Sequence, residues 1–250
     1  MNYIKNIILN ALAIIKKIRT VYRDYSTPPP LVYAPGQYAY ERFINEELSA
    51  CYNYFKKYFY KAIFLPENRL RKYAIENALK KDQSEEYLYL EFGVYTGRST
   101  NYFSSKLKNK FYGFDSFEGF NEDWLGHAHG EGDFSLKNKL PDLNKNVTLE
   151  IGWVQNTLPI FLKKNSDKKI NFVHMDMDTY KTTKFILENI KPYLTNGAII
   201  CFDELYNFEG WSVGEFKALS ETFNESEFIY KCFSSDGAQV VIEYHSVSEK

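Results

Sequence analysis

The sequence of 250 residues contains only three cysteines, Cys51, Cys201 and Cys232, and they are scattered along the chain. Their spacing matches no Cys/His zinc motif, and three thiols cannot build the disulfide framework of a small secreted domain. We therefore expect reduced thiols and a cytoplasmic location.

The sequence also lacks an excess of charge of either sign. Lys and Arg together number 31 and Asp and Glu together number 32, which gives a formal net charge of −1. There is no Lys/Arg-rich run with interleaved aromatic residues, the pattern that is typical of a nucleic-acid-binding face, so we expect no nucleic-acid partner. With 44% hydrophobic residues and no internal repeats, the chain fits one globular domain with appendages.

A long uninterrupted hydrophobic run is absent as well. Apolar residues near the start recur at spacings of four and three and predict an amphipathic helix over residues 1–25: Ile4, Ile8, Ala11, Ile15 and Ile18. This run is too short to span a bilayer and no small-residue cleavage site follows it, so we expect neither a transmembrane segment nor a signal peptide. We expect the helix to pack against the domain or a second subunit in a homo-oligomer, with membrane-surface binding as the alternative.

Prolines separate this helix from the rest of the chain and predict a linker over residues 26–40. Residues 41–82 show a helical pattern that is interrupted at Pro66, and we expect this region to supply a lid together with substrate or dimer contacts. The remaining residues, 83–250, alternate between short apolar runs and helical patterns and form the main domain.

Glycines mark one segment of this domain as a ligand-binding turn. A buried strand breaks at Gly93, the chain turns through Gly97 into a helix near Ser99, and Asp115 ends the next strand. Glycines let a backbone approach a ligand, and a carboxylate at the second strand end can accept hydrogen bonds from ribose hydroxyls, so this unit predicts an adenosine-containing cofactor. The dinucleotide fingerprint Gly-x-Gly-x-x-Gly is missing, and with Glu91 before the turn the pattern favours S-adenosylmethionine (SAM). The alternative is a turn that only packs a helix close to a sheet.

The apolar runs predict seven strands, at residues 87–93, 110–114, 147–151, 170–175, 198–202, 228–233 and 239–244. Helical segments separate the first five strands and require parallel connections, whereas a short turn joins the last two as a hairpin. Parallel strands followed by an antiparallel hairpin are typical of the class I SAM-methyltransferase fold. We therefore expect a Rossmann-like α/β sheet in the order 3-2-1-4-5-7-6, with the last strand antiparallel and a helical extension at the amino terminus.

Four carboxylates follow the fourth and fifth of these strands: Asp176, Asp178, Asp203 and Glu204. In the predicted order they gather beside Gly93 at the carboxyl edge of the sheet, where open α/β sheets bind ligands. Carboxylates so placed repel one another unless a cation is supplied, and a set of oxygen ligands favours Mg²⁺, with Ca²⁺ or Mn²⁺ as alternatives. Some of these acids could instead cap helices or pair with lysines.

The sequence resembles the macrocin O-methyltransferase (TylF-like) family of class I SAM-dependent sugar O-methyltransferases from about residue 65 to residue 243. Six segments carry the resemblance: Leu65-Pro-Glu-Asn-Arg69, Glu91-Phe-Gly-Val-Tyr-Thr-Gly-Arg-Ser99, Tyr112-Gly-Phe-Asp-Ser-Phe-Glu-Gly119, Gly152-Trp-Val-Gln-Asn-Thr-Leu-Pro159, His174-Met-Asp-Met-Asp-Thr-Tyr180 and Cys201-Phe-Asp-Glu-Leu-Tyr206.

This resemblance implies methyl transfer from SAM to a sugar hydroxyl with the help of a divalent metal. The acceptor would be a nucleotide-activated sugar or a glycoside, in bacterial surface-polysaccharide or antibiotic biosynthesis. The alternatives are a catechol-type or other small-molecule O-methyltransferase, which uses the same sheet edge, and a catalytically silent subunit that binds a partner.

The expected cofactor contacts are Glu91, Gly93, Ser99, Asp115, Ser116, Gly152, Trp153 and Asp176. By resemblance, the metal ligands are Asp176, Asp203 and Glu204, although Asp is commoner than Glu at position 204. Asp178 falls on a general-base position. His127 and His129, in a glycine-rich loop, are the alternative bases, and we expect His174 to make a buried hydrogen bond.

Overall fold

The computed structural model describes residues 38–80, 86–127, 129–137 and 139–246. The chain divides into two compact units, residues 1–43 and residues 44–250, and the boundary falls within helix α2 (Ala39–Phe59). The predicted helix over residues 1–25 lies outside the described residues, as does the predicted linker up to residue 37. All contacts reported below lie within residues 44–250.

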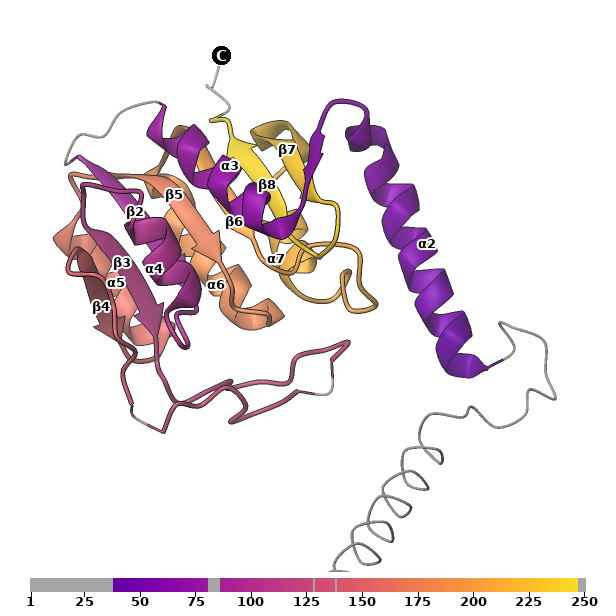
Figure 1. Ribbon diagram of the computed structural model, residues 1–250, viewed down its shortest axis with the longest axis horizontal. Coiled ribbons are helices and arrows are strands. Elements are labelled where there is room, and N and C mark those ends of the chain that lie inside the picture. Colours follow the sequence, from indigo (N-terminus) through magenta and orange to yellow (C-terminus); the bar gives the residue numbers. More distant parts are fainter. Residues whose placement is uncertain (1–37, 81–85, 128, 138, 247–250) are drawn as a thin grey trace, which may run out of the picture. The chain divides into compact units, whose positions relative to one another are not determined.

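Within the described residues, eight strands form one mixed sheet (Figure 1). In chain order they are β1 (Ile63–Leu65), β2 (Tyr87–Phe92), β3 (Phe111–Asp115), β4 (Val147–Ile151), β5 (Lys169–Met175), β6 (Leu194–Phe202), β7 (Phe228–Ser234) and β8 (Val240–Tyr244). Across the sheet the order is β1-β7-β8-β6-β5-β2-β3-β4. Strand β8 runs antiparallel to β6 and β7, and the other neighbouring strands pair in parallel.

The predicted number of seven strands is wrong, because β1 forms an additional strand beside β7 at the edge of the sheet. The predicted order 3-2-1-4-5-7-6 lacks this strand, although the seven predicted strands themselves are present and β8 is antiparallel as expected. Strand β1 lies inside the region predicted to be helical. Three residues are too few to show an alternating pattern, and Pro66 favours an extended conformation for Leu65 before it.

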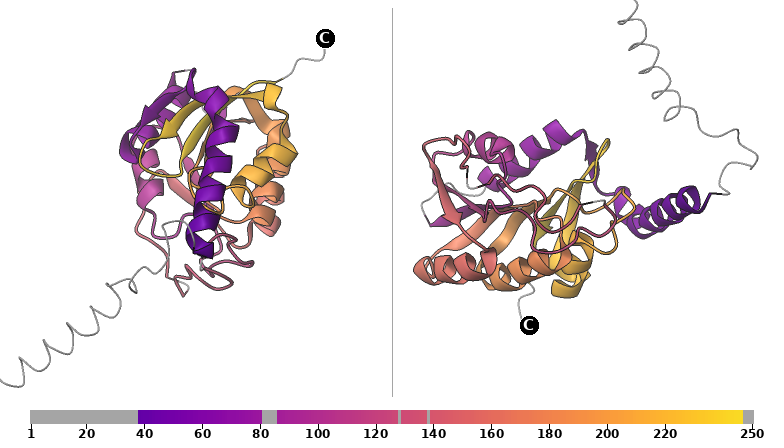
Figure 2. Two further views of the ribbon diagram at one scale, coloured as in Figure 1. Left: turned by 90° about the vertical axis from the view of Figure 1, so that its right-hand side faces the viewer. Right: turned by 90° about the horizontal axis from the view of Figure 1, so that it is seen from below.

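Helices cover both faces of the sheet (Figures 1 and 2). Helices α3 (Glu67–Leu79) and α4 (Arg98–Ser104) pack on one face, where Leu70 and Phe103 join Phe172 of β5 in one core cluster. The other face is covered by α5 (Val154–Lys164), α6 (Tyr180–Ile190) and α7 (Glu215–Thr222). Two short 3₁₀ helices, η1 (Lys191–Tyr193) and η2 (Glu225–Glu227), precede β6 and β7.

Residues 44–59 of α2 also contribute to the core of the second unit. Phe55 is fully buried, and its ring centroid lies 5.8 Å from that of Tyr206 and 5.6 Å from that of Phe233. Among the described residues, none of the helices is both long and apolar enough to cross a bilayer.

The register of the central strands sets where the site forms. Glu91 of β2 pairs with His174 of β5, and His174 pairs with Cys201 of β6, so the three strands end at the same level. The ladder continues past the strand ends, because the Asp176 N–H donates to the Phe92 carbonyl at 2.9 Å. The loops that follow β2, β5 and β6 therefore begin side by side.

Candidate active site

The turn after β2 can be built only with glycine at its first position. Gly93 has a φ of +90°, and a β-carbon added there would lie 1.8 Å from the carbonyl oxygen of Asp176. The backbone of the turn therefore contacts the end of β5 directly. Gly97 has a φ of +78° immediately before α4 begins, which also favours glycine.

Asp115, at the end of β3, holds this turn in place. Its Oδ2 accepts hydrogen bonds from the backbone N–H groups of Val94 at 2.9 Å and Tyr95 at 2.7 Å. Its Oδ1 accepts one from the N–H of Phe117 at 2.7 Å. A carboxylate oxygen can accept more than one hydrogen bond, so Oδ1 retains capacity for a ligand hydroxyl.

A cavity of about 230 Å³ opens beside this turn at the carboxyl ends of the strands. Most of the predicted site residues line it: Gly93, Asp115, Ser116, Gly152, Trp153, Asp176, Asp178 and Glu204. Within the described chain, Glu91, Ser99 and Asp203 are not part of its lining, and Glu91 and Ser99 are buried next to it in β2 and α4. The structure therefore brings the predicted cofactor turn and most of the predicted carboxylates to one cavity.

An aromatic wall that sequence reasoning missed closes the other side of the cavity. It consists of Tyr95, Phe120, Trp124 and Phe134. The Phe134 ring centroid lies 5.6 Å from that of Tyr95 and 5.0 Å from that of Phe120. Three of these rings come from the glycine-rich loop between β3 and β4, where their irregular spacing gives no periodic signal.

The two histidines of that loop pack against its aromatic residues. The His127 ring lies 4.0 Å from Trp124 and 5.2 Å from Phe208, centroid to centroid. His129 places Nδ1 3.2 Å from Asp133 Oδ2, and its side chain is 46% exposed. Neither histidine is among the residues that line the described cavity, so their assignment as a base stays a prediction.

Three half-buried acidic side chains converge on the cavity. One oxygen each of Asp176, Asp178 and Glu204 lies within 4.8 Å of the others. Burial and repulsion from Asp203 raise the pKa values of Asp176 and Glu204 well above the usual range. Burial also raises the pKa of Asp178 to about 6, although a hydrogen bond with Glu204 opposes the rise. Charged carboxylates this close repel one another, and a bound cation would relieve that repulsion.

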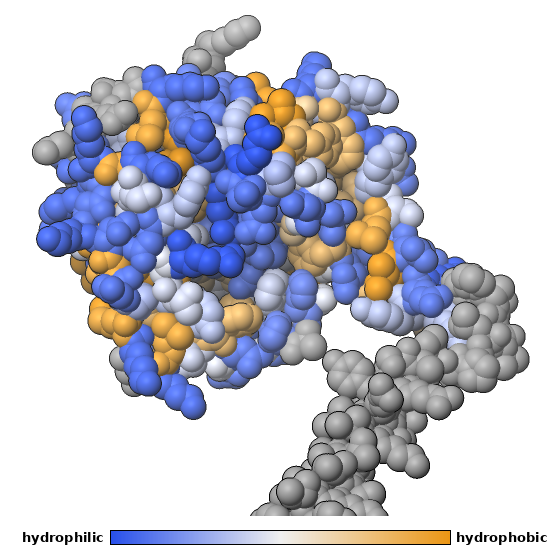
Figure 3. Space-filling view, in the orientation of Figure 1, coloured by the Kyte–Doolittle hydropathy of each residue, from blue (hydrophilic) through white to orange (hydrophobic). Residues whose placement is uncertain are grey.

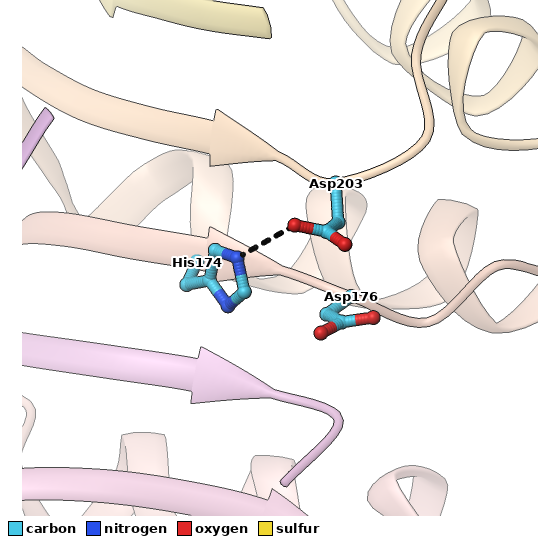
Figure 4. Close-up of side chains that lie close together, drawn as sticks. All are labelled: His174, Asp176 and Asp203. Atoms are coloured by element: carbon cyan, nitrogen blue, oxygen red, sulfur yellow. Dashed lines mark hydrogen bonds and ion pairs between the residues drawn. The ribbon is translucent and has the colours of Figure 1, made fainter. Parts of the chain in front are cut away.

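Asp203 has a different environment from the other three acids (Figure 4). Its Oδ1 accepts hydrogen bonds from Arg71, at 3.0 Å, and from the side-chain amide of Gln239. The same oxygen lies 3.3 Å from Nε2 of His174. Burial alone would raise the pKa of Asp203, but His174 and Arg71 hold it well below its usual range. All of these contacts are made by Oδ1. The second oxygen, Oδ2, therefore remains available to another ligand.

His174 links this carboxylate to a second one. The fully buried ring places Nδ1 2.9 Å from Glu91 Oε1, and Glu91 also accepts a hydrogen bond from the Thr100 hydroxyl. Burial would lower the pKa of His174, but the hydrogen bonds to Asp203 and Glu91 raise it to about 10. The expected buried hydrogen bond of His174 is therefore confirmed. Glu91 belongs to the same buried hydrogen-bond network.

The acidic set fits a hard divalent cation. Asp176, Asp178 and Glu204 offer only oxygen atoms, and Glu204 Oε2 is a buried acceptor without a hydrogen-bond partner among the described residues. Unpartnered buried carboxylate oxygen costs folding free energy, and a divalent cation would satisfy it. Asp176 also belongs to a second group with His174 and Asp203, so the predicted ligands Asp203 and Glu204 fall in different groups that share Asp176.

The backbone at Asp178 is unusual. Asp178 has a φ of +60°, and the Thr179 N–H donates to the Met177 carbonyl at 2.5 Å, which closes a three-residue turn. A turn of this kind with positive φ at a non-glycine residue is rare and strained, and such strain is found mostly at functional sites. The turn points the Asp178 side chain into the cavity.

A fifth acid, Glu215, lies behind this turn and was not identified from the sequence. It is the first residue of α7 and is fully buried. Its Oε1 accepts the Met177 N–H at 3.3 Å, and its Oε2 accepts the Glu204 N–H at 3.2 Å. Burial raises the pKa of Glu215 to about 8.

Comparison with known proteins places this geometry in context. Residues 90–205 match a protein family described as a methyltransferase domain. Comparison with curated protein sequences gives no match. Among solved structures, the chain is similar to the crystal structure of CalS11, described as a calicheamicin methyltransferase, with a TM-score of 0.59, 21% identity and 91% of each chain covered.

The apo structure of CalS11, described as a TDP-rhamnose 3'-O-methyltransferase and an enzyme in calicheamicin biosynthesis, is similar too. Its TM-score is 0.54, at 21% identity, and the match covers 91% of this chain and 92% of that chain. At this identity the likeness shows a shared fold, the class I Rossmann-like fold with a mixed sheet. The domain match on this fold supports a methyltransferase.

Proposed function

We propose that this protein transfers the methyl group of SAM to a hydroxyl group of a sugar held beside a divalent cation. The observation that carries the proposal is the convergence of the half-buried Asp176, Asp178 and Glu204 on the cavity beside the Gly93 turn. A methyltransferase that only bound SAM would not need this cluster. The description of CalS11 as a TDP-rhamnose 3'-O-methyltransferase supports a sugar as acceptor.

The cofactor would occupy the part of the cavity between the turn and β4. Gly93 lines that part of the cavity, and Asp115 Oδ1 would accept a hydrogen bond from a ribose hydroxyl. Ser116, Gly152 and Trp153 line the side where the adenine would lie. Asp176 would contact the amino-acid end of SAM. Glu91 and Ser99, which are buried under the turn, would support the backbone that binds the cofactor.

Asp176, Asp203 and Glu204 would hold the cation, with Mg²⁺ favoured by the oxygen ligands. When bound, the cation would supply the positive charge that lowers the pKa of the acceptor hydroxyl. His174 and Arg71 fix the orientation of Asp203 through Oδ1.

Asp178 is the proposed general base. With a pKa of about 6 it is mostly ionised at neutral pH, and it lies next to Asp176 and Glu204. The acceptor O–H proton passes to an Asp178 carboxylate oxygen, the freed electron pair forms the O–CH₃ bond, and the S–CH₃ bond breaks to leave S-adenosylhomocysteine (SAH). Positioning of the acceptor against the methyl group supplies most of the rate.

The aromatic wall of Tyr95, Phe120, Trp124 and Phe134 would contact the acceptor. Aromatic rings pack against the apolar face of a sugar ring or stack on a nucleobase, which suits a nucleotide-activated sugar or a glycoside. We propose bacterial surface-polysaccharide or antibiotic biosynthesis as the setting, with the enzyme cytoplasmic. A homo-oligomer through the predicted helix at residues 1–25 belongs to the same proposal.

An acceptor screen tests this function. Metal-stripped protein is incubated with SAM, Mg²⁺ and separate panels of nucleotide sugars, glycosides and catechols, and SAH formation is measured. Turnover of a sugar that stops on addition of EDTA supports the proposal. Turnover of catechols alone would favour the small-molecule alternative, and SAH binding with no turnover of any panel would favour the silent subunit.

A further inference from the structure

Glu215 is a fully buried acid next to the candidate site, and its burial does not favour folding. Its carboxyl group is fully buried, so its burial costs folding free energy unless each oxygen is hydrogen-bonded. A glutamate at the first position of an exposed helix would be favoured by the helix dipole, but this one is turned inward toward the sheet.

The two oxygens of Glu215 contact two separate segments of the candidate site. Oε1 accepts the N–H of Met177, which stands between Asp176 and Asp178. Oε2 accepts the N–H of Glu204, which follows Asp203. One carboxyl group therefore bridges the loop after β5 and the loop after β6, and both of these loops carry the proposed metal ligands.

The backbone just before α7 also packs against the loop after β5. A β-carbon added to Gly214 would lie 3.1 Å from the carbonyl oxygen of Asp178, so the residue before Glu215 lies against the strained turn. Gly214 and Glu215 therefore contact the peptide group before Met177 and the one after Asp178. A turn with positive φ at Asp178 persists only where its surroundings hold it.

We propose that Glu215 is a positioning residue that clamps the loops after β5 and β6, and thereby sets the separation between Asp178 and the proposed ligands Asp176 and Glu204. This inference rests on the proposed function. Glu215 acts through backbone N–H groups and contacts neither acceptor nor cofactor. Groups that orient metal ligands typically contribute roughly 10- to 100-fold to metal affinity or activity.

The test uses the full chain with Glu215→Gln. The amide keeps the shape of the side chain but offers one acceptor oxygen, so one of the two backbone N–H groups loses its partner. Glu221→Gln is the matched control, because Glu221 lies on the same helix and pairs at the surface with Lys184 and Tyr180. SAH binding and Mn²⁺ binding are measured separately by calorimetry on metal-stripped protein, followed by kcat and the KM for SAM.

We expect Glu215→Gln to bind SAH as the wild type does, to bind Mn²⁺ roughly 10- to 100-fold more weakly, and to lose kcat by a similar factor with little change in KM for SAM. Glu221→Gln should match the wild type throughout. If Glu215→Gln does not fold, Glu215→Asp carries the same test, because it keeps the carboxylate but withdraws it by one methylene.

Wild-type Mn²⁺ affinity and kcat in a folded Glu215 variant would overturn the clamp and leave the proposed function intact. Parallel loss of SAH binding and Mn²⁺ binding would also overturn it, because a general structural role predicts that result. Wild-type protein that binds SAH but no Mn²⁺ would overturn the metal-assisted function, and the clamp with it.

Discussion

The α-carbon of Gly93 and the carbonyl oxygen of Asp176 are so close that an added β-carbon would lie 1.8 Å from that oxygen. The contact joins the turn that would bind the cofactor to the strand end that carries the acidic cluster. Because the opposing atom belongs to the backbone, no side-chain rotation can relieve a clash there. The two parts of the site can lie this close only because Gly93 has no β-carbon.

Gly93→Ala should therefore weaken cofactor binding strongly. The substitution adds a clash with the Asp176 backbone and places alanine at a φ of +90°. We expect SAH affinity to fall at least about tenfold, which corresponds to about 1.4 kcal/mol. Gly237→Ala is a suitable control, because the nearest atom to its added β-carbon is 3.4 Å away. Equal SAH affinity in both variants, measured by calorimetry, would contradict the placement of the cofactor.

Asp178→Asn should abolish most turnover and spare cofactor binding. The amide cannot accept the acceptor proton, and loss of a general base typically costs roughly 10²- to 10⁴-fold in kcat. SAH affinity should stay at the wild-type value, and the exposed Asp167→Asn should behave as the wild type in both assays. A fully active Asp178→Asn enzyme would remove Asp178 as the base and direct attention to His127 and His129.

The stability of the metal-free protein should fall as the pH rises from about 4 to about 8. Burial raises the pKa of Asp178 to about 6 and that of Glu215 to about 8, so the folded state binds these protons more tightly than the unfolded chain. Their contribution to stability is present at low pH and is lost as the pH rises through these pKa values. Thermal unfolding in EDTA measures the effect, and saturating Mg²⁺ should reduce it. An unfolding midpoint that rises with pH would be inconsistent with this arrangement.

Trp124→Ala should affect the acceptor more than the cofactor. Trp124 lines the cavity from the loop between β3 and β4. Loss of one stacking surface is expected to raise the acceptor KM roughly tenfold, the equivalent of about 1.4 kcal/mol. SAH affinity should not change, and Tyr60→Ala, which removes a 93% exposed ring, serves as the control. Unchanged acceptor KM in steady-state assays would place the sugar elsewhere.

Hydrophobic runs and turn residues were sufficient to predict the seven longer strands and the meeting of the acidic residues with the Gly93 turn. Both depend on local pattern and on the rule that parallel strands end at one edge. Strand β1 was missed because its three residues are stabilised by pairing with β7, which is distant in sequence.

The contacts that orient the site were not predictable in the same way. Arg71 reaches Asp203 across 132 positions of sequence, and in the sequence it is one charged residue of a helix. Glu215 likewise looks like an ordinary acid in the first turn of α7, and only the fold shows that it is buried. Figure 3 shows polar and apolar side chains mixed on one face of the molecule, so exposure and polarity do not simply coincide. Burial of a polar residue depends on tertiary packing, which no local pattern records.

The most direct test of the central claim is calorimetric titration of purified, metal-stripped protein, first with SAH and then with Mg²⁺. Saturable SAH binding followed by a separate Mg²⁺ event is the predicted result, and Asp176→Asn should weaken the second. Absence of SAH binding both with and without Mg²⁺ would contradict the account.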